Sequence, residues 1–413
     1  MNMRRIYLLL LGLGLGSTAF AGGYRVALQG VRQASMGLTS SMHARDASIA
    51  FFNPAGLAFV DSKLSIAVGG FGIINNAKWQ NASTMESAET DNPLGTPVYF
   101  AASYRPIEDL TVGVSFTTPF GSTVKWPEDW AGKANVTEIQ LKSYFIQPTV
   151  AYKFNDWFSA GAGFIYAMGS VNLQRTMSVA GNDIGLEIED SDAHGLGFNV
   201  GAYFRPSEKV NIGLAYRSKV DMKANYGEVT WTDVPTALSG TMPFSSNEFS
   251  ASLPLASEFL AGISYQATER LLLAGEVAVH GWGKYKSLDI QLQNTDTEET
   301  YDSYATKKFI DRAVYKFGAE YQATDMLAVR LGYYFDESPS PADYWSPETP
   351  SNNLHAFTGG IGFKFGEGFY IDAYGQYSMG VERHVHNVES GFEGDVNTNA
   401  FIFGLGLSYN FLN

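Results

Sequence analysis

The sequence predicts an all-β protein: a transmembrane antiparallel β-barrel of about 14 strands with a small N-terminal helical hatch inside its lumen. Three observations predict this fold class. Large apolar side chains alternate with small or polar ones along much of the chain, as in strands with two different faces. No stretch after residue 21 offers the 18 consecutive apolar residues of a membrane helix. Short and long connections also alternate, as in outer-membrane barrels.

The composition excludes several other classes of protein. Of the 413 residues, 45% are apolar, only 17% are charged and the mean hydropathy is -0.09. Soluble domains carry about 25% charged residues. The composition is too apolar for a disordered chain, and without long apolar runs it does not fit a bundle of membrane helices.

The N-terminus predicts export from the cytoplasm. Arg4 and Arg5 precede an apolar stretch over 6–16, and Ala19-Phe20-Ala21 follows as a cleavage site between small residues, so residues 1–21 are typical of a secretory signal peptide. The apolar stretch is shorter than the ~20 residues of a spanning helix. No Cys follows it, which excludes a lipoprotein anchor. An uncleaved anchor is the alternative to a mature chain that begins near Gly22.

Charge and cysteine content limit the partners of the mature chain. Without Arg4 and Arg5 it has 26 basic and 42 acidic residues, for a net charge of -16. Because nucleic-acid binding needs a basic face, we expect no nucleic-acid partner. With 0 Cys, disulfides, Cys-ligated zinc and iron–sulfur clusters are excluded.

Residues 22–62 do not follow the alternating pattern. Segments 31–37 and 47–52 predict short helical turns, and the second should stop at Asn53-Pro54 because Pro disfavours helix at the preceding residue. About forty residues rich in Ala and Gly cannot bury a core of their own. We therefore expect this segment to lie inside the barrel as a hatch. A disordered periplasmic tail is the alternative.

The last predicted strand illustrates the strand pattern. In 400–411, six large residues from Phe401 to Phe411 share one face, and Gly404, Gly406, Ser408 and Asn410 lie on the other. Small residues on the second face fit the crowded inside of a barrel whose greasy side meets lipid. Together with this barrel, the export signal predicts the bacterial outer membrane. The barrel is assigned to 63–413, with strands at 63–74, 96–105, 110–119, 136–153, 157–178, 193–205, 210–223, 257–266, 271–293, 308–321, 327–335, 354–365, 369–388 and 399–411.

The connections predict which end of the barrel faces the cell exterior. Short turns lie at 106–109, 155–156, 206–209, 267–270, 322–326 and 366–368, and we assign them to the periplasm. Long loops lie near 75–95, 120–135, 179–192, 224–256, 294–307, 336–353 and 389–398, and we assign them to the outside. An even strand count returns both chain ends to the periplasm.

Two segments carry a family resemblance. Residues 44–58, ARDASIAFFNPAGLA, closely resemble the N-terminal hatch of FadL-type outer-membrane transporters of long-chain fatty acids and aromatic hydrocarbons, with Asn53, Pro54, Ala55 and Gly56 as the hatch motif. Residues 117–121 and 126–132 resemble the third strand and following loop of that family. The resemblance covers nearly the whole mature chain. One departure is that Leu412 and Asn413 follow the terminal aromatic residue.

The resemblance implies passive uptake of hydrophobic compounds, with no cofactor. The implied route is capture at the extracellular loops, passage to an interior apolar site beside the hatch, and lateral release at a kinked third strand. Pro119, Phe120 and Gly121 are the predicted kink, because Pro cannot donate a ladder hydrogen bond and Gly weakens a strand. An ordinary strand end is the alternative at this position. The expected partners are hydrophobic small molecules and outer-membrane lipid, and the expected state is a monomer.

Candidate ligand-binding residues are apolar groups on the hatch and inward cations on the wall. An apolar ligand needs an apolar surface inside the protein, for which the hatch offers Phe51, Phe52, Leu57, Phe59 and Val60. A carboxylate would also need a cation or hydrogen-bond donors. Strand parity points four cations inward: Arg105, Arg217, Lys316 and Arg330. The alternative for each cation is a structural ion pair with an inward acid such as Glu276, Glu320 or Asp372.

No catalytic or metal-binding constellation is evident, and we expect no enzyme. The six His show no HExxH spacing, and neither GxSxG nor a nucleotide-binding motif occurs. His384 and His386 share one strand face without a third ligand, so we predict no metal site. An outer-membrane phospholipase with a Ser and a His on the wall would leave the hatch unexplained. The main alternative to transport is an adhesin or structural barrel that binds a partner through acidic loops 336–353 and 389–398. A general diffusion porin ranks third.

Overall fold

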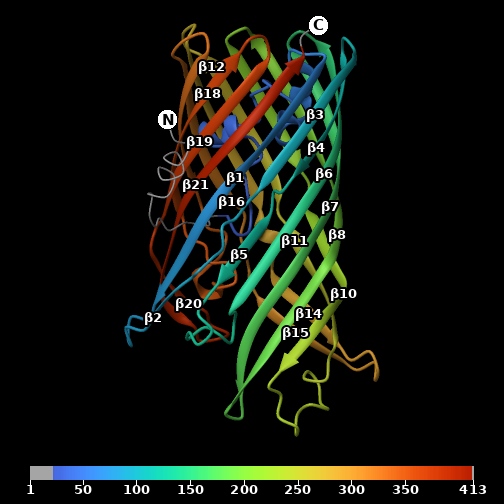
Figure 1. The fold of residues 1–413 in the computed structure, drawn as a ribbon, viewed down its shortest axis with the longest axis vertical. Helices are drawn as coiled ribbons and strands as arrows, with labels where there is room; N and C mark the ends of the chain where they lie inside the picture. Colours follow the sequence, from blue (N-terminus) through green and yellow to red (C-terminus); the bar gives the residue numbers. More distant parts are fainter. Residues whose placement is uncertain (1–21, 412–413) are drawn as a thin grey trace, which may run out of the picture.

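The computed structural model describes residues 22–411, which form one closed antiparallel β-barrel (Figure 1). Fourteen strand positions complete the wall, and the barrel closes where the first and last strands, β1 and β21, pair along 17 residues from Leu64↔Phe411 to Gln80↔Asp395. The predicted signal peptide and the last two residues lie outside the described residues. No helix in the described part of the chain has the length and apolarity to cross a membrane.

In order around the barrel, the wall strands are β1 (Leu64–Gln80), β3 (Val98–Ile107), β4 (Leu110–Thr117), β6 (Glu138–Asn155), β7 (Phe158–Val179), β8 (Asn182–Ser207), β9 (Val210–Arg217), β12 (Ser257–Gln266), β13 (Leu271–Gly281), β16 (Arg312–Gln322), β17 (Leu327–Asp336), β18 (Leu354–Phe365), β19 (Phe369–Gly380) and β21 (Glu393–Phe411). Further strands extend the wall beyond these or form hairpins at the long-loop end: β2 (Ser87–Glu89), β5 (Gly121–Lys125), β10 (Val220–Thr232), β11 (Glu248–Leu255), β14 (Ser287–Gln293), β15 (Thr300–Thr306) and β20 (Arg383–His386). The short helices are α1 (Val31–Ser35), α2 (Ile49–Phe52), η2 (Pro54–Phe59), η3 (Trp282–Lys284) and η4 (Ala342–Tyr344).

The alternation along each strand has the predicted sense. On β21, Leu405 is 65% exposed on the outer face, whereas Ser408 and Asn410 are buried on the lumen side. The other large residues of the outer face, from Phe401 to Phe411, are also exposed. An apolar outer face and a polar or small inner face define a barrel that meets lipid. The predicted fold class is therefore confirmed.

Several predicted strand boundaries were wrong, all toward the long-loop end. The predicted strands 210–223, 271–293 and 369–388 are each split in two, at 218–219, 282–286 and 381–382. The loop predicted at 179–192 is mostly strand, because β7 and β8 run on to a tight turn at Ala180-Gly181. Parts of the loops predicted at 224–256 and 294–307 are also strand. The alternation persists there with the opposite sense, because that part of the sheet lies beyond the lipid. Ile184, Leu186 and Ile188 are buried on the inner face, and the polar residues between them lie on the outer face.

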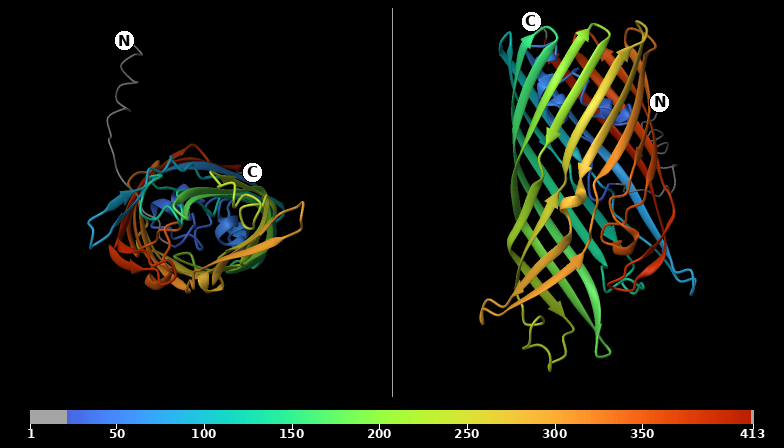
Figure 2. Two further views of the ribbon diagram at one scale, coloured as in Figure 1. Left: turned by 90° about the horizontal axis from the view of Figure 1, so that it is seen from below. Right: turned by 180° about the vertical axis from the view of Figure 1, so that it is seen from behind.

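Residues 22–62, here called the N-terminal segment, lie inside the barrel (Figure 2). Almost every residue from 27 to 60 is buried, and α1, α2 and η2 occupy the lumen near the end that carries the short turns.

Glycines on the inner wall make room for the backbone of this segment. A Cβ on Gly332 would lie 2.0 Å from the backbone N of Gly37, and a Cβ on Gly201 would lie 2.0 Å from Oδ1 of Asn53. Similar clashes with the N-terminal segment, at 2.1 to 2.6 Å, would arise at Gly161, Gly213, Gly262, Gly318 and Gly360. The small inner residues therefore reflect direct contact between wall and segment.

We expect Gly332→Val to displace the N-terminal segment at Met36-Gly37 and to lower the free energy of unfolding by about 1–3 kcal/mol, the usual cost of overpacking. Urea unfolding, followed by heat-modifiable gel migration, measures this change. The matched control is Gly375→Val, because a Cβ on Gly375 has nothing within 4 Å. Equal effects of the two substitutions would contradict the proposed contact.

Candidate functional site

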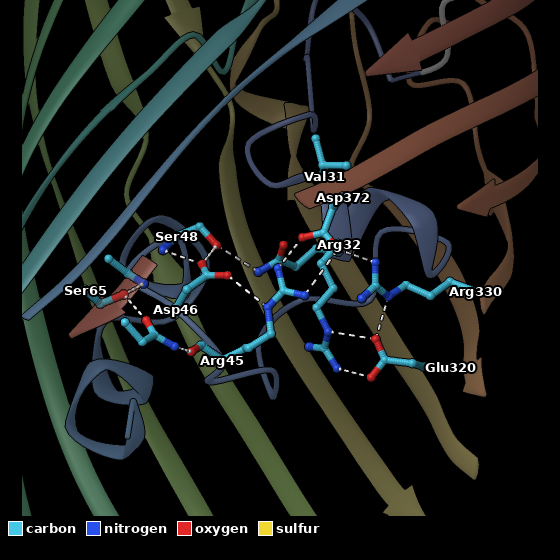
Figure 3. Close-up of polar contacts among 12 residues, drawn as sticks. Val31, Arg32, Arg45, Asp46, Ser48, Ser65, Glu320, Arg330 and Asp372 are labelled. Atoms are coloured by element: carbon cyan, nitrogen blue, oxygen red, sulfur yellow. Dashed lines mark hydrogen bonds and ion pairs between the residues drawn. The ribbon is translucent and has the colours of Figure 1, made fainter. Parts of the chain in front are cut away.

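A buried ionic network fastens the N-terminal segment to the wall (Figure 3). Arg32 donates to both oxygens of Glu320 on β16, at 3.0 and 2.7 Å. Arg45 binds Asp46 at 3.1 Å and also Asp372 on β19. Arg330 on β17 joins the two halves, with 2.5 Å to Glu320 and 2.6 Å to Asp372. Every carboxylate in this network has a guanidinium partner, which buried charges require.

Further polar contacts tie the segment to other strands. Lys316 donates to Glu276 at 2.8 Å, and Glu276 accepts the backbone N–H groups of Ser40 and Ser41 at 3.2 and 2.7 Å. Arg25 pairs with Asp336 at 2.8 Å. Glu276, Lys316 and Asp336 belong to β13, β16 and β17, so these contacts attach the segment to several strands of the wall.

The hatch motif residues have local structural roles. The Asn53 side chain accepts from the backbone N of Ala55 at 3.1 Å and caps η2, which begins at Pro54. Its amide donates to the carbonyls of Ser41 and Ala202, at 2.9 and 3.0 Å. A side chain that bonds its own turn, the segment and the wall explains why Asn with Pro occurs here.

The structure separates the predicted ligand residues into two groups. Phe51, Phe52, Arg217 and Lys316 line a small cavity of about 20 Å³ at the level of α2. Leu57, Phe59 and Arg330 do not line this cavity. Phe59 packs on Tyr203, with ring centroids 5.0 Å apart, and Leu57 approaches Gly113 of β4.

Arg217, Lys316 and Arg330 form the ion pairs that were the alternative to ligand binding, whereas Arg105 bonds backbone carbonyls. Lys316 and Arg330 pair with Glu276, Glu320 and Asp372 as described above. Arg217 binds Glu258 at 2.8 Å and the carbonyl of Phe51 at 2.5 Å, with its guanidinium 3.7 Å from the Phe51 ring centre. Arg105 donates to the carbonyls of Ala58 and Val60.

The small cavity also contains groups that the sequence reading missed. His280 is 1% exposed and, within residues 22–411, neither of its ring nitrogens has a hydrogen-bond partner. Nε of Arg217 and of Arg25 are also without partners there. Glu258 lies 3.8 Å from Nδ1 of His280. Strand parity points His280 inward, so parity applied to every His would have found it.

A larger apolar cavity, of about 90 Å³, lies on the long-loop side of the N-terminal segment. Residues from many distant strands line it, and apart from Lys142, Lys307 and Glu348 almost all are apolar or small: among them are Tyr24, Phe120, Ile139, Leu173, Ile188, Ala193, Met222, Phe249, Leu255, Tyr285 and Leu288. Lys307 at its border already donates to Ser346 at 2.6 Å. This cavity suits an apolar occupant.

The third strand of the wall is interrupted at the predicted kink. β4 ends at Thr117 and β5 begins at Gly121, and both pair with β6. Between them the chain turns toward the N-terminal segment: Pro119 accepts from the N–H of Val26 at 2.7 Å, and Gly121 donates to Tyr24 at 2.9 Å. The strand therefore breaks here, and the N-terminal segment pairs with the residues at the break.

An open cavity of about 490 Å³, here called the lateral cavity, lies beside this break, between β5 and segment 93–98. Leu94 and Val98 at its edge are exposed. Phe120 lines this lateral cavity, the apolar cavity and the small cavity. One buried ring thus borders all three spaces.

Aromatic residues join three of the long loops. Trp126 stacks on Trp130, with ring centroids 4.2 Å apart and 8° between their planes. Phe392 contacts Trp130 and stacks on Trp345, at 5.5 and 6.0 Å. Since all these rings are buried, they fix the loops relative to one another.

Within residues 22–411 no group of three His, Cys, Asp or Glu side chains has a geometry that holds a metal ion. His384 binds Asp395 at 3.0 Å. Burial lowers the pKa of His43 to about 3, and the positive charge of Arg32 contributes a smaller part of this shift. The His43 side chain is therefore neutral inside the barrel.

The fold and lumen define the class of protein: a lipid-facing outer-membrane β-barrel with an occupied interior. The family model described as outer membrane protein transport protein (OMPP1/FadL/TodX) matches residues 12–411. A long-chain fatty acid transport protein of Salmonella typhi is 23% identical over 350 residues, which is 76% of each chain. A FadL homologue of Pseudomonas aeruginosa superposes with a TM-score of 0.80 at 18% identity, over 94% of this chain and 100% of that one. The toluene transporter TodX of Pseudomonas putida superposes with a TM-score of 0.75 at 16% identity, over 93% and 99%.

The chain belongs to the OMPP1/FadL/TodX family of outer-membrane transport proteins. It is therefore a transport protein of the bacterial outer membrane and not an enzyme. This assignment does not favour the adhesin alternative. The family transports hydrophobic small molecules such as fatty acids and aromatic compounds.

Proposed function

We propose that this barrel is a passive uptake channel in which a hydrophobic compound is captured at the long loops and occupies the apolar cavity. The N-terminal segment acts as the hatch that keeps the lumen closed to water. The compound leaves through the lateral cavity beside the break between β4 and β5. The observation that carries the proposal is Phe120, which borders the apolar cavity on one side and the lateral cavity on the other.

The proposed route avoids the aqueous part of the lumen. An apolar molecule gains nothing from a water-filled pore, whereas an apolar cavity next to an opening in the wall offers continuous apolar contact. We propose that a single chain carries out transport as a monomer. Transfer follows the concentration gradient, since the sequence contains no nucleotide-binding motif.

For a ligand with a carboxylate, we propose the small cavity as the place for its head. Arg217 and Lys316 line that cavity, and charge-assisted hydrogen bonds to a carboxylate are strong. Phe51 and Phe52 would contact the adjoining part of the chain. Arg330, with two carboxylate partners, would keep the hatch in place. Leu57 and Phe59 would support the hatch on the wall.

The test is uptake by cells that lack their own transporters of this kind and express this chain. Labelled long-chain fatty acid and labelled toluene are supplied separately, because relatives of the two kinds are similar to this chain. We expect uptake of at least one compound above that of cells with an empty vector. No uptake of either, at normal surface levels of folded barrel, would contradict the proposal.

Phe120→Ala tests the lateral route in the same cells. Removing the ring joins the apolar and lateral cavities, so we expect faster uptake of the transported compound. Phe116→Ala is the control. Phe116 lies on β4, just before the break, and lines neither the apolar nor the lateral cavity. Unchanged uptake in Phe120→Ala would argue against release through this opening.

A further inference from the structure

A trough lies on the outer side of the sheet whose inner side borders the apolar cavity. It lies between β10, β11 and the β14–β15 hairpin and has a volume of about 550 Å³. Figure 2 shows this hairpin, in orange, projecting from the wall. Most of the side chains that line the trough are polar, among them Lys223, Ser252, Asp289, Gln291, Asp302 and Tyr304. Ala224, Ala251 and Ile290 also border it.

Strand register places the polar side chains Lys223, Ser252, Asp289, Gln291, Asp302 and Tyr304 on the outer face. Lys223 pairs with Ser252, Asp289 with Tyr304, and Gln291 with Asp302, so each pair shares one face. Alternate residues such as Leu253 and Leu288 line the apolar cavity in the lumen. Because successive side chains point to opposite sides, the trough opens away from the lumen.

The trough begins where the apolar outer face ends. On β8, Leu196 and Phe198 are 61% and 48% exposed, and the next outward residue toward the long loops is His194. His194 pairs directly with Lys223. A Lys and a His at the edge of the apolar face lie at the level of lipid headgroups, on the side that carries the long loops.

The groups in the trough are suited to a phosphorylated sugar. Lys223 is exposed and takes part in no ion pair among residues 22–411, although the neighbouring Asp221 is paired with Lys219 at 2.7 Å. Nδ1 of His194 contacts the carbonyl of Asp192 at 3.1 Å, which leaves Nε2 directed elsewhere. At the other end, Asp289, Gln291 and Asp302 offer acceptors for hydroxyl groups. Tyr304 is 74% exposed there, and an aromatic ring with a hydroxyl suits a wet, mixed surface.

We propose that this trough binds the phosphorylated sugar headgroup of a glycolipid in the outer leaflet. The phosphate lies at Lys223 and His194, the sugar hydroxyls bond Asp289, Gln291 and Asp302, and the acyl chains run down the apolar face past Leu196. A chain with 42 acidic and 28 basic residues repels anions in general, so binding depends on this local pair of basic residues. The site is separate from the transport route.

The test is native mass spectrometry of the purified full-length barrel in detergent. Three lipids are compared: lipid A, which is an acylated glucosamine disaccharide with two phosphates, its dephosphorylated form, and phosphatidylglycerol. We expect lipid A to bind most tightly. Lys223→Gln should weaken lipid A binding about tenfold, because a charge-assisted hydrogen bond is lost, and should leave the dephosphorylated form unaffected. Tyr304→Ala should weaken both sugar lipids.

The control is Lys364→Gln, an exposed lysine on β18 far from the trough. It should leave lipid A binding unchanged. Equal binding of lipid A and phosphatidylglycerol, or equal loss of binding in the two lysine variants, would overturn the proposal, since either result means attraction to anions without a site. Unchanged lipid A binding in Lys223→Gln would also overturn it.

Discussion

Ala193→Trp is expected to reduce uptake of the transported compound about tenfold or more. Ala193 is buried on β8 and lines the apolar cavity, and an indole there occupies space that the compound needs. A loss of 1.4 kcal/mol in binding already corresponds to about a tenfold weaker site. Uptake of labelled fatty acid or toluene by cells measures the effect.

The matched control for this substitution is Ala162→Trp. Ala162 is on the neighbouring strand β7 but is exposed on the outer face, where an indole lies against lipid. Its uptake should equal that of the unmodified chain. Heat-modifiable gel migration confirms that both variants are folded barrels. Normal uptake in folded Ala193→Trp would show that the compound does not pass through this cavity.

Asp372→Ala is expected to loosen the N-terminal segment and to raise ion conductance in planar bilayers. The substitution removes a carboxylate shared by Arg45 and Arg330, both of which are largely buried. Removing one partner of a buried ion pair costs about 3–5 kcal/mol, because the remaining charge is left without compensation. Urea unfolding measures the stability, and single-channel recording measures the opening of the lumen.

Two further variants separate charge from structure in this experiment. Asp372→Asn keeps an oxygen acceptor but no charge, so its effect should be smaller. Asp156→Asn removes a carboxylate that pairs with Lys153 at 2.8 Å in an exposed turn, and exposed pairs contribute little. It should behave as the unmodified chain. A closed, equally stable barrel in Asp372→Ala would mean that the network does not hold the segment.

The fold was predictable because its evidence is local. A strand that faces lipid on one side repeats its pattern every two residues, and 400–411 carries that pattern without reference to any other segment. The same rule failed for 179–192, where β8 extends into water and the alternation has the opposite sense, with Ile184, Leu186 and Ile188 buried inside. Turn positions such as 267–270 were also local, since they interrupt the alternation.

The candidate site was only partly predictable. Parity pointed Arg217 and Lys316 inward, where both line the small cavity, but it could not say that Leu57 and Phe59 face the wall. It also could not distinguish a cation that is free to bind ligand from one held by acids. Arg45 and Asp372 are 327 residues apart in the sequence, so their contact depends on how the barrel closes.

The sequence by itself determined the barrel, its lipid-facing side, the presence of a separate N-terminal segment and the likeness to FadL-type transporters. Only the tertiary structure decided which residues surround the cavities, that Phe120 borders three of them and that a polar trough lies outside the wall. The physical reason is that the face on which a side chain lies, and the position of a turn, depend on neighbouring residues along the chain. Cavities and ion pairs depend on the stagger between strands and on how the N-terminal segment packs against the wall, and no single stretch of sequence records either.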